Sequence, residues 1–102
     1  MIKVPKKVDA MRIKITPIFI KEGVIRSAVF GSFAEGRETK QSDIDILVQL
    51  SPKKSLLDLS DLKIQLESKL GKKVDILTYD SIPHQLKNII EKQKIEIYEK
   101  KF

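Results

Sequence analysis

The sequence predicts an α/β domain in which helices pack against a small mixed β-sheet. Three segments carry apolar residues at the intervals of three and four typical of amphipathic helices, and four short segments are rich in the apolar and β-branched residues of strands. These segments follow one another in the order α-β-β-α-β-α-β, which favours a two-layer arrangement. With 102 residues, the chain is long enough for one domain, expected over residues 1–102, and too short for two.

Residues 4–23 form the first predicted helix. Its apolar residues follow one helical stripe, which consists of Val8, Met11, Ile15, Ile18 and Phe19. Pro17 interrupts this pattern, either because Thr16 caps a second short helix or because a single helix is kinked there. Gly23 is expected to end the helix.

Two strands are predicted over residues 24–30 and 44–50. The second is almost continuously apolar, which indicates that both of its faces are mostly covered. Between the strands, Gly31 is expected to turn the chain and Ser32 to cap a helical turn that ends near residue 36. Residues 37–42 are polar and are expected to form a loop.

The second half of the chain contains the clearest helix, over residues 55–70. Ser55 and Asp58 resemble a capping box, and Gly71 is expected to end the helix. The predicted buried stripe consists of Leu59, Leu62, Leu66 and Leu70.

The remaining elements are shorter. A strand is predicted over residues 74–79, a helix opens at residues 81–83, and a final strand over residues 95–98 is expected near the sheet edge. The inner face of this helix is expected to contain Leu86, Ile89 and Ile90.

The composition is that of a globular protein. Apolar residues make up 41% of the chain and charged residues 33%, and no apolar run approaches the roughly 18 residues of a membrane span. The absence of cysteine excludes disulfides, thiolate metal sites and a cysteine nucleophile. Residues 1–9 lack the apolar segment of a signal peptide. The lack of cysteine fits a cytosolic protein, so a cytoplasmic location is expected.

The formal net charge is +6, which suits a nucleotide, a nucleic acid or an acidic partner, and equally suits lysines that only keep the protein in solution. The basic residues are dispersed along the chain, and the few aromatic residues do not alternate with them, so a stacking platform for single strands is not expected. A nucleic-acid-binding module is therefore the least favoured hypothesis.

Asp43 and Asp45 carry the strongest functional signal. They flank Ile44 at the start of an apolar strand, where residues i and i+2 point to the same face. Two carboxylates so close repel each other unless a cation lies between them, so the pair favours a divalent metal. Asp75, in an apolar strand expected beside this one, is the candidate third ligand, although an isolated strand aspartate is usually a solvated edge residue. Three carboxylates would suit two Mg²⁺ ions that also bind phosphates.

Gly31 and Ser32 precede these acids. The backbone N–H groups of such a turn are suited to holding a phosphate. Gly-Ser begins many ordinary turns, so the pair gains meaning only because ten residues separate it from Asp43 and Asp45. Metal ligands together with a phosphate-holding turn indicate nucleotide chemistry.

This constellation resembles the minimal nucleotidyltransferase family of the DNA polymerase β-like superfamily. The family signature is Gly-Ser, about ten residues, Asp-x-Asp and a third acid on a later strand. It is matched residue by residue by Gly31-Ser32, Asp43-Ile44-Asp45 and Asp75. The resemblance covers residues 18–98 and implies the polymerase β-like nucleotidyltransferase fold.

The resemblance also implies a Mg²⁺-dependent transfer of a nucleoside monophosphate, with AMP from ATP as the expected case, to a hydroxyl. The Gly31-Ser32 turn would contact the terminal phosphates. Asp43 and Asp45 would ligate both Mg²⁺ ions, whereas Asp75 would ligate the catalytic ion and help to deprotonate the attacking hydroxyl.

Many stand-alone members of the family are antitoxins. Their partner is a HEPN-domain ribonuclease toxin, which receives AMP on a tyrosine, and the resemblance implies such a partner here. The alternative is a non-catalytic antitoxin that neutralises its partner by binding. Because 102 residues leave little room for an acceptor-binding region, the partner or a second subunit is expected to supply that surface.

One residue departs from the family pattern, which often reads Gly-Ser-x-Ala-Arg-Gly. Glu35 stands at the arginine position. An acid there would repel a triphosphate in the absence of metal, and Arg37, two residues further on, is the expected substitute.

Overall fold

The computed structural model describes residues 4–101, which form one four-stranded sheet and its covering helices. Along the chain the elements are α1 (Lys6–Glu22), β1 (Val24–Phe30), α2 (Gly31–Glu35), β2 (Ile44–Leu50), α3 (Leu56–Leu70), β3 (Val74–Thr78), the 3₁₀ turns η1 (Tyr79–Ser81) and η2 (His84–Leu86), α4 (Lys87–Gln93) and β4 (Ile95–Glu99). Among residues 4–101, no helix combines the length and the apolar character needed to cross a membrane.

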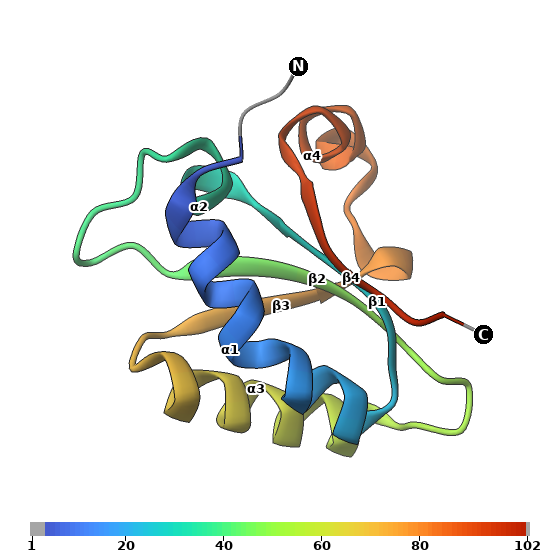
Figure 1. The fold of residues 1–102 in the computed structure, drawn as a ribbon. Helices are drawn as coiled ribbons and strands as arrows, with labels where there is room; N and C mark the ends of the chain where they lie inside the picture. Colours follow the sequence, from blue (N-terminus) through green and yellow to red (C-terminus); the bar gives the residue numbers. More distant parts are fainter. Residues whose placement is uncertain (1–3, 102) are drawn as a thin grey trace.

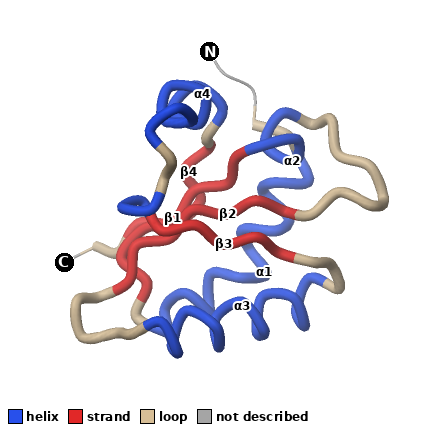
Figure 2. The backbone as a smooth tube through the Cα atoms, turned by 180° about the vertical axis from the view of Figure 1, so that it is seen from behind, coloured by secondary structure: helices blue, strands red, loops and turns tan. Residues whose placement is uncertain are grey.

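The sheet is mixed, with the strand order β3-β2-β1-β4. Strand β1 runs antiparallel to both β2 and β4, whereas β2 and β3 run parallel. Parallel neighbours need a crossover connection, and α3 provides it. Figure 1 shows α1 and α3 on one side of the sheet, and Figure 2 shows the sheet from the other side, with α4 away from these two helices. The predicted fold class, a small mixed sheet packed with helices, is confirmed.

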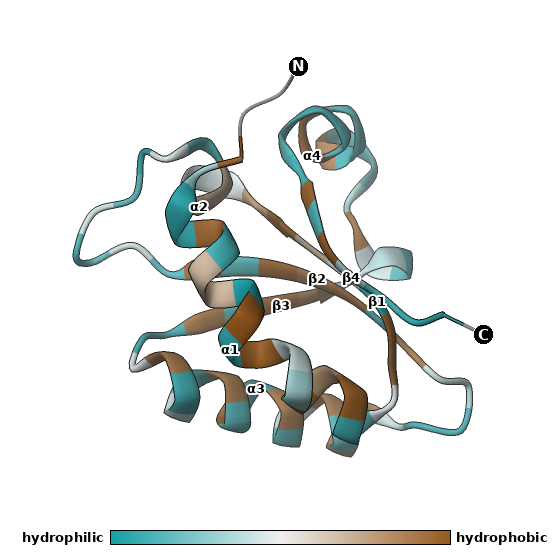
Figure 3. Cartoon of the chain, in the orientation of Figure 1, coloured by the Kyte–Doolittle hydropathy of each residue, from teal (hydrophilic) through white to brown (hydrophobic). Residues whose placement is uncertain are grey.

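The main core lies between the sheet and the helices α1 and α3. Its buried side chains include Val8, Met11, Ile15, Phe19, Ile44, Ile46, Val48, Leu62 and Leu66. A smaller cluster on the opposite face joins Ala28, Leu47 and Ile90. Strand β2 is therefore covered on both faces, which explains its almost continuous apolar sequence. Figure 3 shows this contrast, with apolar strands and a hydrophilic loop between α2 and β2.

Helix α1 continues through Pro17, so the single-helix interpretation holds and the two-helix one is wrong. Proline cannot donate a hydrogen bond to the carbonyl of Ile13, four residues earlier. Ile13 is 68% exposed, so water can reach this part of the helix. The hydroxyl of Thr16 does not cap a second helix and instead donates to the carbonyl of Arg12 at 2.6 Å.

The bounds of β1 and β2 agree with the predicted strands at residues 24–30 and 44–50. The predicted capping box at the start of α3 is also present, because the backbone N–H of Ser55 donates to the Asp58 carboxylate at 2.8 Å. Gly71 ends α3 in the left-handed conformation. Strand β4 lies at the sheet edge, as predicted for residues 95–98.

Two local predictions were wrong. Ser32 does not cap α2, since the helix begins at Gly31, after the extended residue Phe30, and Ser32 lies inside it. The positive φ of Gly31, +72°, turns the chain one residue earlier than a serine cap would. The helix expected from residues 81–83 is replaced by two 3₁₀ turns, and α4 begins only at Lys87.

The face of this last helix was also predicted incorrectly. Of its three expected inner residues only Ile90 is buried, whereas Leu86 and Ile89 are exposed. The reason is that α4 is short, with 7 residues, and meets the sheet through a single buried side chain.

We predict that Leu66→Ala destabilises the domain by about 2–5 kcal/mol, because Leu66 is completely buried and its loss leaves a cavity. Ile64, on the outer face of the same helix, is 64% exposed, and Ile64→Ala should change the free energy of unfolding by no more than about 0.5 kcal/mol. Urea unfolding of both variants measures the difference, and similar losses would contradict this assignment of the core.

Candidate active site

The predicted site residues lie along the margin of the sheet where β1 ends and β2 and β3 begin. Because β1 runs antiparallel to β2 and β3, its last residue and the first residues of β2 and β3 share this edge. In the strand register, Asp45 stands opposite Phe30 on one side and opposite Asp75 on the other. The sheet thus brings Gly31, Asp45 and Asp75 together although Gly31 and Asp75 lie 44 positions apart in the sequence.

The three aspartates differ in exposure and position. Asp45 lies within β2 and is partly buried, Asp75 lies within β3 and is exposed, and Asp43 is exposed in the loop just before β2. Burial raises the pKa of the Asp45 carboxyl, and the negative charges of Asp75 and Asp43 raise it further. The carboxylates are therefore close enough to repel one another.

Asp45 is also in close contact with the turn that follows β1. A Cβ atom added to Gly31 would lie only 2.2 Å from Oδ2 of Asp45. Gly31 is required for this approach, and its φ of +72° independently favours glycine. The turn and the carboxylate therefore form one compact unit.

The chemistry of these side chains suits a hard divalent cation. Carboxylate oxygens are the ligands that Mg²⁺ prefers, and a cation would relieve the repulsion that raises the Asp45 pKa. Within residues 4–101, however, no group of three or more His, Cys, Asp or Glu side chains already has the arrangement of a metal site. The three-aspartate Mg²⁺ site consequently stays a prediction.

The polar contacts around Gly31 involve a residue that the sequence did not indicate. The backbone N–H of Gly31 donates to Oε1 of Gln93 at 3.2 Å, and Nε2 of Gln93 donates to Oε1 of Glu35 at 3.3 Å. Gln93 is the last residue of α4 and lies 62 positions from Gly31 in the sequence. No local motif marks it, so only the fold reveals this contact.

Arg37 does not stand free as the expected substitute for the family's arginine. Its Nε donates to Oε1 of Glu35 at 3.2 Å, and its Nη2 forms a closer contact with the same oxygen. Ser32 is partly buried, and within the described part of the chain its hydroxyl forms no hydrogen bond. Of the predicted phosphate-binding residues, Gly31 and Arg37 thus already have partners inside the protein.

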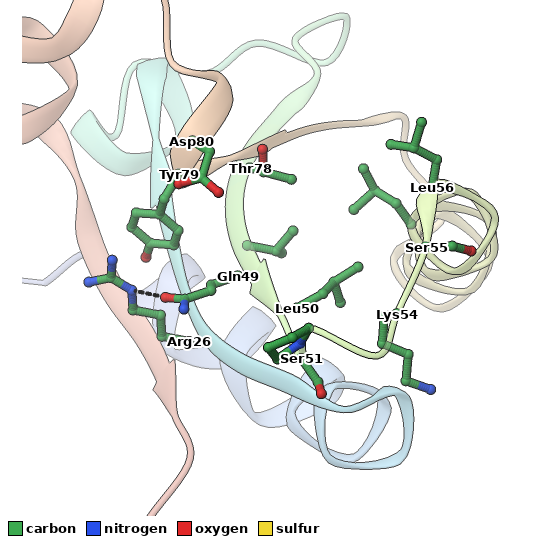
Figure 4. Close-up of a pocket in the computed structure, with 13 residues that line it drawn as sticks. Arg26, Gln49, Leu50, Ser51, Lys54, Ser55, Leu56, Thr78, Tyr79 and Asp80 are labelled. Atoms are coloured by element: carbon green, nitrogen blue, oxygen red, sulfur yellow. Dashed lines mark hydrogen bonds between the residues drawn. The ribbon is translucent and has the colours of Figure 1, made fainter.

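A cavity of about 620 Å³ lies at the opposite end of β2 (Figure 4). In it, Nε of Arg26 donates to Oε1 of Gln49 at 2.7 Å, and the guanidinium lies 4.0 Å from the ring centroid of Tyr79. Burial raises the pKa of Tyr79 to about 12, and its hydroxyl has no hydrogen-bond partner among residues 4–101. None of the predicted site residues lines this cavity, so the cavity is separate from the site of the three aspartates.

Comparison with known proteins identifies clear relatives. Residues 13–102 match the family model described as "Polymerase beta, Nucleotidyltransferase". A protein of Methanocaldococcus jannaschii named "putative protein adenylyltransferase" is 47% identical over 90 residues, which cover 88% of this chain and 97% of the relative.

Solved structures share the fold. One described as a "putative minimal nucleotidyltransferase" is 32% identical, with a TM-score of 0.76 over 88% of this chain and 92% of its own. Another contains a tri-AMPylated HEPN toxin of Shewanella oneidensis in complex with an MNT antitoxin. It is 20% identical, with a TM-score of 0.69 over 91% of this chain and 73% of its own, and supports the fold alone.

We predict that Gly31→Ala destabilises the protein more than Gly36→Ala. Both glycines have a positive φ, of +72° and +73°, which costs a residue with a Cβ roughly 1–2 kcal/mol. Only at Gly31 would the new methyl group also displace Asp45, because nothing lies within 4 Å of the corresponding position at Gly36. Chemical unfolding of both variants gives the difference; equal losses would show that Asp45 does not contact the turn.

Asp45→Asn should raise the melting temperature of the metal-free protein near neutral pH. The pKa of Asp45 is raised above its ordinary value of 3.8 in the folded protein, so its charge destabilises the fold. This destabilisation is absent below the unfolded pKa and develops as the pH rises through the folded pKa. The stabilisation by asparagine should therefore appear at about pH 7 and vanish at about pH 3 in thermal unfolding with EDTA.

Asp61→Asn is the matched control for this measurement, because Asp61 is exposed on α3. Its melting temperature relative to the parent should stay constant over the same pH range. If Asp45→Asn behaves like this control, the repulsion among the three aspartates is too weak to matter.

Proposed function

The chain belongs to the polymerase beta nucleotidyltransferase family, and on this basis we propose that it transfers AMP from ATP to a tyrosine hydroxyl of a HEPN-type toxin. In this role it acts as the antitoxin of a two-protein module. The observation that carries the proposal is the contact of Asp45 with the Gly31 turn beside Asp75, where the sheet gathers the family's signature residues.

The proposed chemistry follows from what each side chain offers. Asp43, Asp45 and Asp75 would hold two Mg²⁺ ions, which supply positive charge to the triphosphate and to the attacking oxygen. The Gly31-Ser32 turn, with Arg37, would bind the terminal phosphates. Both Asp43 and Asp75 are exposed, so an acceptor on another protein can approach the edge of the sheet.

In the transfer, the acceptor oxygen forms a bond to the α-phosphorus of ATP while the bond from this phosphorus to the oxygen of the leaving pyrophosphate breaks. Asp75, which is exposed whereas Asp45 is partly buried, would accept the hydroxyl proton. The products are the AMP ester of the acceptor and pyrophosphate.

The descriptions of two similar proteins suggest which acceptor and partner classes to test. The relative from Methanocaldococcus jannaschii, which the chain matches over almost its whole length, bears the name of a protein adenylyltransferase. The complex from Shewanella oneidensis, which shares the fold, pairs an MNT antitoxin with a toxin that carries AMP groups. A HEPN-type protein is therefore the acceptor to test first, and a tyrosine hydroxyl is the acceptor group that the family resemblance implies.

A second candidate is an antitoxin that acts by binding alone. The pairing of Glu35 with Arg37 favours it, because the arginine that would contact the triphosphate is already neutralised. Binding alone would not need the three aspartates, and this separates the two functions.

We predict that Asp45→Asn lowers AMP transfer by roughly 100-fold or more, since even residues that only support metal ligands contribute about 10- to 100-fold. The assay follows label from α-labelled ATP into a HEPN-type toxin of the same genome, with and without Mg²⁺. Asp61→Asn, a change of the same chemistry on an exposed part of α3, should leave transfer unchanged.

A double variant separates the enzyme from the binding antitoxin in cells. If transfer requires the aspartates, the Asp43→Ala/Asp45→Ala double variant should no longer protect cells from the toxin. Full protection by this variant would favour the binding antitoxin, and label transfer by it in vitro would refute the metal-dependent mechanism.

A further inference from the structure

Gln93 connects the end of α4 to both ends of the short helix α2. Its side-chain oxygen accepts the N–H of Gly31 at 3.2 Å, and its side-chain nitrogen donates to the Glu35 carboxylate at 3.3 Å. Gln93 is partly buried, and α4 and α2 pack against each other. Gln93 therefore lies beside the turn that is in contact with Asp45.

The chemistry of its neighbours determines the orientation of the Gln93 amide. If oxygen and nitrogen were exchanged, the NH₂ group would face the N–H of Gly31 and the oxygen would face the Glu35 carboxylate. Both contacts would then be repulsive. The side-chain oxygen of Gln93 is consequently held against the N–H of Gly31 as long as Glu35 accepts from the side-chain nitrogen.

Glu35 is itself fixed by a cation. Arg37 donates to Oε1 of Glu35, the same oxygen that accepts from Gln93. These contacts form a chain that begins at Arg37 and ends at the single N–H hydrogen that Gly31 can donate. A phosphate oxygen and the Gln93 oxygen are both acceptors, and a single N–H cannot serve both at full strength.

We propose that Gln93 is a positioning residue that sets the affinity of this site for a nucleoside triphosphate. In the nucleotide-free protein its carboxamide occupies the Gly31 N–H, and a phosphate oxygen must displace it. The bond between Gln93 and Glu35 opposes this displacement, because the amide must leave both partners at once. The inference rests on the proposed function, since it supposes that the triphosphate meets the Gly31 turn.

Gln93→Met tests the proposal, because methionine keeps a chain of similar length but has no strong acceptor or donor. Releasing one hydrogen bond should lower the KM for ATP by about 2- to 10-fold and leave kcat within about twofold of the parent. Gln93→Glu should have the opposite effect, since it places a second carboxylate beside Glu35 and the phosphates, and should raise this KM by roughly 10-fold. Gln85→Met, at an exposed position of η2, is the control and should change neither constant.

A second measurement examines the contact without any nucleotide. In the parent, the amide proton of Gly31 should exchange slowly with solvent. Gln93→Met should accelerate this exchange and shift the Gly31 resonance, and Gln85→Met should not. Unchanged Gly31 exchange in Gln93→Met would show that the hydrogen bond does not exist in solution and would overturn the proposal.

The outcomes distinguish this inference from the proposed function. If the parent transfers AMP and Gln93→Met shows an equal or higher KM for ATP, only the role of Gln93 is refuted. A fall in kcat at constant KM would likewise refute it, because Gln93 would then act on the chemical step. If the parent neither binds ATP with Mg²⁺ nor transfers AMP, the proposed function fails, and the role of Gln93 fails with it.

Discussion

The contact between Asp45 and Gly31 is the constraint on which the candidate site depends. Oδ2 of Asp45 lies only 2.2 Å from where a Cβ at position 31 would be, so the turn requires glycine, and the positive φ of this residue independently favours glycine. The antiparallel pairing of β1 and β2 produces this approach, because Phe30 and Asp45 are partners in the register. The end of β1 thereby determines the surroundings of the Asp45 carboxylate near the start of β2.

The same sheet explains why charged residues are tolerated at this edge and not elsewhere on β2. The middle of β2 is buried on both faces, by the main core and by the smaller cluster around Leu47. A carboxylate there would lose its hydration with no compensating partner. Asp45 lies one residue inside the strand and is only partly buried, so it keeps some solvent and acquires a raised pKa. A position of this kind can hold a charge that becomes favourable when a cation binds.

Much of this arrangement was predictable because it depends on short-range sequence patterns. The strands β1 and β2, the capping box at Ser55 and the glycine at the end of α3 each depend on residues a few positions apart. The placement of Asp75 beside Asp45 followed from two apolar strands expected to be neighbours, and the register confirms that they are adjacent. The role of the aspartates as metal ligands rests on the repulsion expected between close carboxylates and on the family resemblance, and it stays a prediction.

The errors share a different origin. The face of α4 was predicted incorrectly because a helix of 7 residues presents too few positions for a periodic pattern, and its packing is determined by the sheet it meets. The contacts of Gln93 could not be predicted for a related reason. A lone glutamine has no local signature, and its partners are 58 and 62 positions away in the sequence.

Glu35 alters what the proposed reaction requires of this chain. Its carboxylate pairs with Arg37 at an exposed position, where such ion pairs contribute no more than about 1 kcal/mol, so a triphosphate can compete for the arginine. Once Arg37 turns to a phosphate, however, Glu35 is left as an uncompensated negative charge next to the ligand. In the proposed mechanism, the positive charge that an arginine at position 35 would have supplied would then have to come from cations bound by the aspartates. ATP binding in this chain should therefore depend more steeply on the divalent metal than it would in a relative that keeps the arginine.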